Sequence, residues 1–293
     1  MSCFCCLSDE MVAAPIGLKN YLGCCECGFV FLEQSHRERA QNNVIYHHEN
    51  IDPHWKVAES KQKFFRYALD KLASQVDYSP KAILDVGCNY GYFLKGAFQI
   101  GWQTFGVDIA TDAVKATRKL IGEKSVFRGT LKEAKFADNF FDAITLWDVL
   151  CLVNNPADEI TESFRVLKQD GIIGIRLGNL IFQKIAYHAY ERFKSGFLRL
   201  GIKKPYVFQH FCFTPSSIKK LLARSGFTNI NVEISPLTVG DPYQYMKTPH
   251  LVSLCKIFTH ISAKTLYLVS NGKLLVGSSM LVWAQKPSND AEN

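Results

Sequence analysis

The chain has 293 residues, of which 47% are hydrophobic and 21% are charged, a composition that fits one large globular domain or a larger domain with a small companion. Its formal net charge of +7 is spread out, and no dense Lys/Arg run interleaves with aromatic residues, so we do not expect nucleic-acid binding. No apolar run reaches the ~18–20 residues of a membrane-spanning helix and no secretory signal is recognisable, so a cytoplasmic protein is expected.

Cysteines dominate the first part of the chain. Six of the ten lie within the first 27 residues, and Cys3-x-x-Cys6 and Cys24-x-x-Cys27 are separated by 17 residues. This spacing is typical of a structural zinc site with four thiolate ligands, so a zinc-ribbon-like module is predicted over residues 1–34. Cys5 and Cys25 leave the choice of ligands open, and free cysteines in an unfolded N-terminus are the alternative.

The next segment, 35–78, is predicted to be a polar linker followed by a helix from Trp55 to about Val76. Strands and helices then alternate. The expected strands are 82–87, 102–109, 125–130, 141–150 and 171–179, and the expected helices are 91–100, 111–121 with Thr111 as N-cap, and 156–168. Such alternation indicates an α/β domain, placed at 79–287, with a parallel sheet covered on both faces.

Residues 180–212 interrupt this alternation before a helix at 213–227, capped by Thr214, and strands at 229–237 and 278–287. The interruption is aromatic and basic, with Glu191 as its single acid. One interpretation is a lid for an anionic or membrane-associated acceptor. A solvated amphipathic helix packed on the body is an equally good one.

The segment "DVGCNYGYF", residues 85–93, joins the first of these strands to a helix. Glycines there let a ligand approach the backbone N–H groups of a helix N-terminus, as the pyrophosphate of a dinucleotide or the nucleoside of S-adenosylmethionine does. The dinucleotide fingerprint requires three glycines, but Asn89 and Tyr92 occupy the second and third positions, which disfavours an NAD-dependent oxidoreductase. The carboxylate of Asp85 suits a cationic sulfonium ligand better, and a tight turn without a ligand is the remaining alternative.

Asp108 ends the next strand, in "GVDIA". A carboxylate at this place can accept hydrogen bonds from both ribose hydroxyls of a nucleotide-like ligand. Capping of the following helix is the alternative role.

These motifs resemble those of the class I S-adenosylmethionine-dependent methyltransferases, closest to the small-molecule branch that includes ubiquinone and sugar methyltransferases. The resemblance covers about residues 60–180, and more weakly 207–230 and 278–287; it rests on "LDVGCNYGYFL", "GVDIA", "FRGTLKEAKFADNFFDAITLWDVL" and "RVLKQDGIIGIRLGN". It implies a Rossmann-like, doubly wound, seven-stranded sheet preceded by the ribbon. It also implies transfer of a methyl group to an oxygen, nitrogen or carbon of a small-molecule acceptor, whose identity the sequence does not give.

The resemblance further implies the cofactor-binding residues, which are Asp85, Gly87, Cys88, Asn89, Tyr90, Gly91, Asp108, Ile109, Thr130, Leu131 and Trp147. Asn89 replaces the usual middle glycine, and since asparagine tolerates a left-handed backbone we expect binding to survive. Thr130 replaces a common acid.

Cys151 and Leu152 stand where many relatives have Glu-His, so a general base or metal ligand is absent there. His210, in "FQHFCFTP", falls where the resemblance places a histidine near the active site, and is expected to act as catalytic base or to orient the acceptor. A structural histidine is equally compatible. These departures keep open a non-catalytic protein that binds the cofactor or docks a partner through the ribbon.

Overall fold

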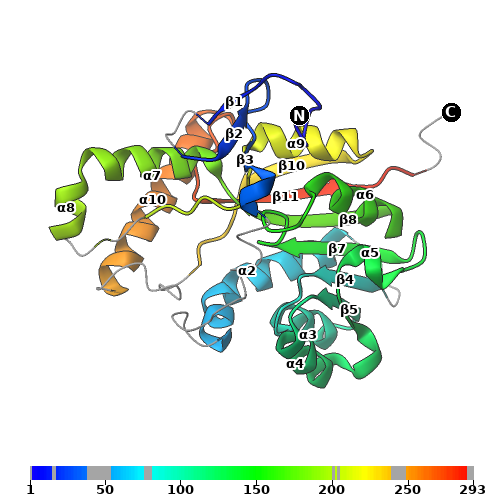
Figure 1. Cartoon of the computed structure of the whole chain (residues 1–293). Helices are drawn as coiled ribbons and strands as arrows, with labels where there is room; N and C mark the ends of the chain where they lie inside the picture. The colour runs from blue at the N-terminus through cyan, green and yellow to red at the C-terminus, as the bar shows by residue number, and fades with distance from the viewer. Residues whose placement is uncertain are drawn as a thin grey trace. The chain divides into compact units, whose positions relative to one another are not determined.

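A computed structural model describes residues 2–14, 18–37, 54–75, 81–199, 202, 205–238 and 249–288 (Figure 1). The chain forms two units, each built from separate stretches of sequence. The first comprises Met1–Phe64, Gly178–Ile218 and Ile234–Met280. The second comprises Phe65–Leu177, Lys219–Glu233 and Leu281–Asn293 and contains most of the large sheet.

The large sheet has seven strands in the order β10-β11-β8-β7-β4-β5-β6. Their bounds are β4 Ala82–Val86, β5 Gln103–Asp108, β6 Val126–Arg128, β7 Phe141–Trp147, β8 Leu167–Gly178, β10 Thr228–Ile234 and β11 Ser279–Gln285. The pairs β4–β5, β4–β7, β5–β6 and β7–β8 are parallel. β11 is antiparallel to β8, because the Lys286 N–H donates to the Gly171 carbonyl while the Asn179 N–H donates to that of Ser278. The predicted α/β fold with a seven-stranded, Rossmann-like sheet is confirmed.

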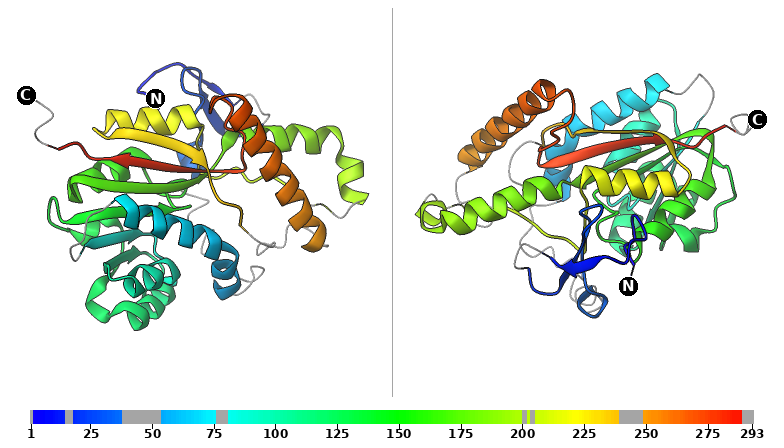
Figure 2. Two further views of the ribbon diagram at one scale, coloured as in Figure 1. Left: turned by 180° about the vertical axis from the view of Figure 1, so that it is seen from behind. Right: turned by 90° about the horizontal axis from the view of Figure 1, so that it is seen from above.

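Helices cover both faces of this sheet, which is why its central strands are continuous apolar runs. Their bounds are α2 His54–Gln75, α3 Tyr92–Gln99, α4 Thr111–Ile121, α5 Leu131–Ala134, α6 Pro156–Val166 and α9 Pro215–Arg224. Figure 2 shows α2 and α9 on opposite faces. On the α2 face the rings of Phe65 and Phe93 lie 5.6 Å apart, and all five residues of β4 are buried.

The expected elements are present, with small differences at their ends. Thr111 is the first residue of α4 and not its N-cap; Ala110 is the N-cap, and the carboxylate of Asp108 accepts the Ala110 N–H at 2.8 Å. β7 stops at Trp147, earlier than expected, because Asp148 takes a left-handed backbone with φ 63°. Thr214 caps α9 as predicted, accepting the Ser217 N–H at 3.1 Å.

A second, four-stranded sheet lies in the first unit and has the order β1-β2-β3-β9. Its strands are β1 Met11–Ala13, β2 Tyr21–Cys24, β3 Val30–Leu32 and β9 Phe211–Cys212, all antiparallel to their neighbours. The N-terminal module therefore pairs with a strand about 180 residues later in the chain. Phenylalanine rings fill the space beside this junction, at Phe4, Phe29, Phe31, Phe211 and Phe213.

The segment 180–212 begins with two helices, α7 Leu180–Arg192 and α8 Lys194–Arg199. Its aromatic residues pack on one another, with Tyr187 and Tyr206 at 5.1 Å between ring centroids and Tyr206 and Phe208 at 5.6 Å. Lys203 and Lys204, two basic residues of this segment, lie outside the described residues.

One long helix, α10 Pro249–Val269, was not expected, because no element was predicted between 238 and 277. It ends where Asn271 and Gly272 take left-handed conformations and the Gly272 N–H donates to the Tyr267 carbonyl at 2.8 Å. Within the described part of the chain, no helix combines the length and the hydropathy needed to cross a bilayer.

Candidate functional site

The turn between β4 and α3 has an unusual backbone that its sequence explains. Gly87, Asn89 and Gly91 all have positive φ values, of 69°, 48° and 71°. A Cβ on Gly87 would lie 2.3 Å from the Val149 side chain, and one on Gly91 would lie 2.5 Å from that of Thr117. Both positions therefore require glycine, and Asn89 takes the left-handed conformation that its place in the motif predicts.

Asp108, at the end of β5, holds this turn in place. One carboxylate oxygen accepts the Asn89 N–H at 2.8 Å and the other accepts the Ala110 N–H at 2.8 Å. Burial raises the pKa of Asp108, and these N–H donors partly offset that effect by favouring the carboxylate. A carboxylate has about four acceptor sites, so a ligand can still donate a hydrogen bond to this group.

Asp85 lies on the same face of the sheet as Asp108. It pairs with Gly106 in β5, and side chains two residues apart on a strand share a face. Its carboxylate accepts the Thr145 hydroxyl at 2.7 Å, and the residue is 3% exposed. Asp85 therefore places a negative charge beneath the turn.

The start of α3 and its surroundings complete the site. The helix has Gly91 as N-cap and no side-chain capping hydrogen bond. The N-terminus of a helix is a place where backbone N–H groups can bind the polar end of a ligand. Ile109, directly after Asp108, is 64% exposed and offers an apolar surface for a planar ring. Carboxylates, N–H donors and an apolar surface at the carboxyl ends of parallel strands together fit a nucleoside with a cationic group.

The other predicted cofactor residues lie around this turn or in the core. Thr130 caps α5, exchanging hydrogen bonds with Glu133, and Leu131 behind it is buried. Trp147 packs edge-on against Phe93 at 5.3 Å between ring centroids. Cys88 is buried and Tyr90 is half-buried; burial beside two carboxylates raises the pKa of the Cys88 thiol, which keeps it protonated.

An ion pair that the sequence analysis did not identify lies at the ends of β7 and β8. The Arg176 guanidinium donates to the Asp148 carboxylate at 2.5 Å, and the Arg176 side chain is only 9% exposed. A single charged residue inside the apolar strand "GIIGIRLG" is the signal that could have revealed it, because buried charges are rare unless paired. Arg176 lies opposite Trp147 in the register of the two strands.

The N-terminal cysteines form a cluster. The sulfur atoms of Cys3, Cys6, Cys24 and Cys27 all lie within 4.8 Å of one another, with 3.6 Å between Cys3 and Cys27 and 3.5 Å between Cys6 and Cys24. These are the four predicted ligands: Cys24 and Cys27 lie in the β2–β3 hairpin, and Cys3 and Cys6 lie at the N-terminal turn. The neighbouring Cys25 is exposed.

His210, the predicted catalytic residue, lies in the first unit directly before β9. Its carbonyl accepts the Leu32 N–H at 2.8 Å, and it is 8% exposed. Its Nδ1 has no hydrogen-bond partner among the described residues. Burial and the positive charge of Arg37 lower the pKa of His210, so the imidazole is neutral at neutral pH.

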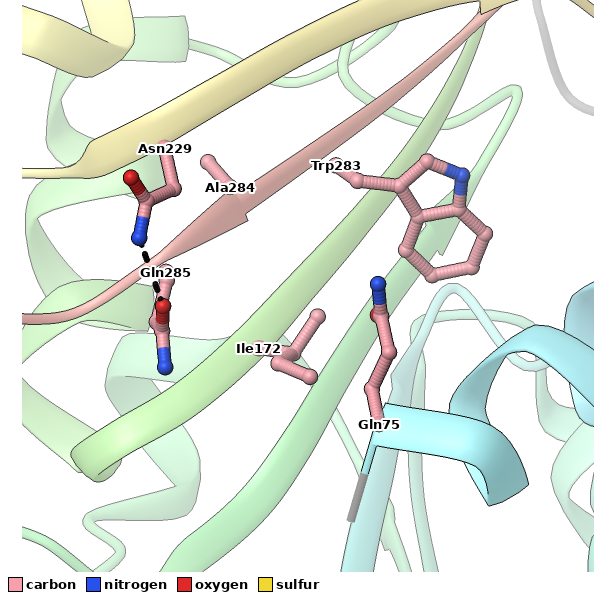
Figure 3. A pocket seen from close by; sticks show the side chains of 6 residues that line it. All are labelled: Gln75, Ile172, Asn229, Trp283, Ala284 and Gln285. Atoms are coloured by element: carbon pink, nitrogen blue, oxygen red, sulfur yellow. Dashed lines mark hydrogen bonds between the residues drawn. The ribbon is translucent and has the colours of Figure 1, made fainter.

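A pocket of about 230 Å³ lies elsewhere in the second unit (Figure 3). It is lined by Gln75, Ile172, Asn229, Trp283, Ala284 and Gln285. Ile172 comes early in β8 and Gln285 ends the antiparallel β11, so the pocket is at the amino ends of the parallel strands. Ligands of such sheets bind at the opposite edge, so we assign it no function.

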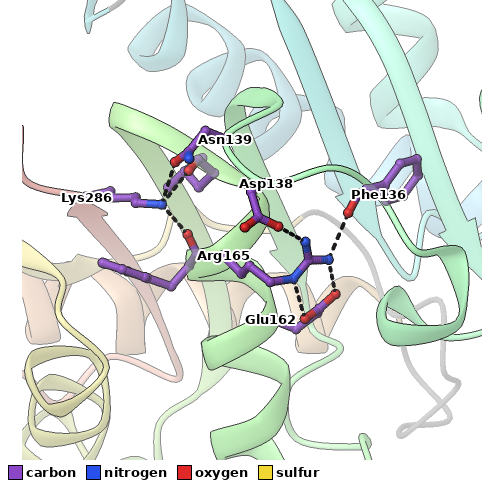
Figure 4. Close-up of polar contacts among 8 residues, drawn as sticks. Phe136, Asp138, Asn139, Glu162, Arg165 and Lys286 are labelled. Atoms are coloured by element: carbon purple, nitrogen blue, oxygen red, sulfur yellow. Dashed lines mark hydrogen bonds and ion pairs between the residues drawn. The ribbon is translucent and has the colours of Figure 1, made fainter.

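Polar contacts at the same edge are structural (Figure 4). The Lys286 ammonium donates to the Asn139 side chain at 2.9 Å and to the carbonyls of Phe164 and Leu167 at 2.8 Å. Arg165 pairs with Glu162 and Asp138. These bonds fix the end of β11 and the start of β8 to the loop before β7.

Comparison with known families identifies the central part of the chain. Residues 84–175 match the family model described as a methyltransferase domain. The ubiquinone biosynthesis O-methyltransferase of Xanthomonas oryzae pv. oryzae is 32% identical over 108 residues, covering 35% of this chain and 45% of the relative. That of Psychrobacter arcticus is 26% identical over 176 residues, covering 56% of this chain and 67% of the relative. The chain thus spans less than half of the first relative.

Solved structures share the fold. One is the complex of the Haloferax volcanii Trm112 methyltransferase activator with a protein assigned as a methyltransferase, at a TM-score of 0.51, 14% identity, and coverage of 78% of this chain and 93% of that one. Another is a Listeria monocytogenes protein assigned as an S-adenosylmethionine-dependent methyltransferase, at a TM-score of 0.50, 15% identity, and coverage of 78% and 100%. Residues 84–175 therefore match a methyltransferase domain, and the chain shares its fold with these structures.

Proposed function

We propose that this protein transfers a methyl group from S-adenosylmethionine to a small-molecule acceptor. The observation that carries the proposal is the turn 87–91, which is joined to Asp108 by the hydrogen bond from the Asn89 N–H and directly follows the strand that holds the buried Asp85. When bound, S-adenosylmethionine supplies an electrophilic methyl group on a sulfonium sulfur. The acceptor loses a proton as its bond to that methyl group forms.

The residues of the chain would act mainly by positioning. Asp108 would accept the ribose hydroxyls, the N–H groups at the start of α3 would bind the polar end, and Ile109 would cover the adenine. Alignment alone can lower a barrier by several kcal/mol, up to ~7–11 kcal/mol in ideal systems. This is the contribution expected here, because the sulfonium needs no further activation.

His210 is proposed as the general base that takes the proton of the acceptor. In support, its imidazole is neutral at neutral pH and its Nδ1 has no described protein partner. A neutral imidazole is the form that accepts a proton.

The four-cysteine cluster is proposed to bind a structural Zn²⁺. Four thiolates leave no open coordination position, which is typical of structural and not catalytic zinc. The tight grouping of the sulfur atoms of Cys3, Cys6, Cys24 and Cys27 supports this proposal.

A labelling experiment tests the methyl transfer. The full chain is incubated with cell extract and S-adenosylmethionine carrying an isotope-labelled methyl group, and metabolites are compared by mass spectrometry. We expect a small molecule that gains one labelled methyl group with the wild type, and much less label with Asp108→Asn at the same low cofactor concentration. A wild type that binds the cofactor but labels no molecule would instead support a non-catalytic role.

A further inference from the structure

The helix α10 exposes an apolar face. Along one side it carries Leu254, Ile257, Phe258, Ile261, Leu268 and Val269, which are between 45% and 81% exposed. Their spacing of three, four and seven residues places them on a single stripe of a helix with 3.6 residues per turn. From Leu254 to Val269 this stripe is roughly 22 Å long at 1.5 Å per residue.

This stripe is not the side by which the helix packs on its own unit. Ala263, on the opposite side, is 3% exposed, and Lys256, His260 and Tyr267 near it are half-buried. A surface helix of a globular protein normally turns its apolar side to the core and its polar side to water. In α10 large apolar side chains line the outward side, and a continuous exposed patch of this kind marks an interaction surface.

The part of the sequence that contains the stripe is strongly basic. Residues 178–289 contain 14 Lys and Arg but only 3 Asp and Glu, and no acid occurs between Asp241 and Asp290. The remainder of the chain has more acids than bases, since the whole carries only +7. The positive charge is therefore concentrated in the sequence that contains α10, including the exposed Lys264 and Lys273.

The helices α7 and α8, in the same unit, repeat this combination. Ile185, Phe193 and Leu198 are 54%, 64% and 57% exposed, and the exposed Arg192 and Lys194 stand beside Phe193. Two separate helical segments thus combine exposed large apolar side chains with basic ones.

We propose that α10 is a membrane-surface helix, which inserts its apolar stripe among the headgroups of an anionic phospholipid bilayer. Helices that lie in the plane of such a bilayer combine an apolar stripe with basic residues, as α10 does with Lys256 and Lys264, and each Lys or Arg near the surface adds electrostatic attraction to the lipid.

A second copy of this chain is the competing occupant, and the charges argue against it. Two copies would bring like-charged segments together, which opposes association. Lysine is also depleted in protein interfaces, whereas it is favoured at anionic lipid surfaces. The inference concerns membrane binding alone and holds whether or not the chain transfers a methyl group.

Vesicle co-sedimentation of the full chain tests the proposal. The vesicles are phosphatidylcholine alone or phosphatidylcholine mixed with phosphatidylglycerol. Phe258→Ser/Ile261→Ser removes two exposed side chains of the stripe, and the matched control Phe98→Ser/Ile100→Ser removes an exposed Phe and Ile of the second unit, 56% and 54% exposed. A third variant, Lys264→Glu/Lys273→Glu, reverses two charges.

We expect binding to the anionic vesicles that weakens with salt, falls at least about 10-fold in Phe258→Ser/Ile261→Ser, and is unchanged in the matched control. The charge reversal should also weaken it. Absence of binding, equal binding to both kinds of vesicle, or equal loss in stripe and control variants would overturn the proposal. So would sedimentation velocity showing a dimer that Phe258→Ser/Ile261→Ser dissociates, because the stripe would then be a dimer interface.

Discussion

Asp108 is the residue at which cofactor binding can be tested most directly. Replacing it by Asn removes the charge and one acceptor while keeping the size of the side chain. A hydrogen bond to a charged group contributes ~1.5–3 kcal/mol, so we expect affinity for S-adenosylmethionine to fall roughly 10- to 100-fold. Equilibrium dialysis measures this.

The control for Asp108 is Asp112→Asn, which changes an exposed carboxylate in the first turn of α4. It should bind like the wild type. Because Asp108 also supports the turn 87–91, the melting temperature of each variant is measured as well. If affinity survives in a folded Asp108→Asn, the ribose role is wrong.

His210 should make the free energy of unfolding depend on pH, and the sign of this dependence follows from its pKa. Its pKa in the folded protein lies below that of an ordinary histidine, ~6.5, so the unfolded chain binds the additional proton first. The contribution of neutral His210 to stability is therefore present above pH ~6.5 and is lost as the pH falls through the folded pKa. Urea unfolding between neutral and acidic pH should show a smaller loss for His210→Gln than for the wild type.

If His210 is the general base, it should also control the rate of methyl transfer. Activity of the wild type should decline on the acidic side with a midpoint below pH ~6.5, and His210→Gln should lose that limb together with most of its activity. A His210→Gln enzyme with the wild-type pH profile would make His210 purely structural.

At the scale of elements, the cysteine cluster and β9 are joined. β9 pairs with β3, and the Thr214 hydroxyl donates to the Cys27 carbonyl at 2.9 Å. Loss of metal should therefore loosen the segment around His210 as well as the N-terminus. We expect Cys24→Ser to lose its bound zinc and to show faster hydrogen exchange over residues 205–214.

Cys25→Ser is the matched control, because Cys25 is the exposed neighbour of a proposed ligand. Its metal content and exchange should equal those of the wild type. Equal metal loss in both variants would contradict the assignment of Cys24 as a ligand. Unchanged hydrogen exchange at 205–214 in the zinc-free Cys24→Ser would show that the metal does not stabilise β9.

The glycine turn makes a second prediction at this scale. In Gly91→Ala the new Cβ would meet Thr117 at 2.5 Å on a backbone with φ 71°. Strain and overlap together should lower the free energy of unfolding by about 2 kcal/mol or more. Gly101→Ala, with φ 93° but no neighbouring atom within 4 Å, should lose only about 1 kcal/mol.

At the scale of the molecule, the sequence predicts those features that a short local pattern of residues determines. The run "AILDVG" and its glycine turn give β4 and the start of α3, and the Cys-x-x-Cys pairs give the cluster. The pairing of β3 with β9 could not be read, because it joins residues about 180 positions apart through long-range packing. The charged Arg176 inside an apolar strand could have indicated a buried ion pair, but its partner Asp148 lies directly after a neighbouring strand, and the sequence alone does not pair the two.

The helix α10 was not predicted from the sequence for a different reason. Its apolar residues are frequent on more than one side. The hydrophobic repeat of three to four residues that marks a core-facing helix is therefore weak in this segment. Its exposed stripe became apparent only when burial was known. The basic, aromatic segment 180–212 was recognised from composition, but its division into α7 and α8 was not.

The most direct test of the central claim is a crystal structure of the full chain with S-adenosylhomocysteine, the product form of the cofactor. We predict that the ribose hydroxyls bind the Asp108 carboxylate and that the amino-acid end lies beside the turn 87–91. A ligand bound elsewhere, or an empty turn at saturating ligand, would contradict it.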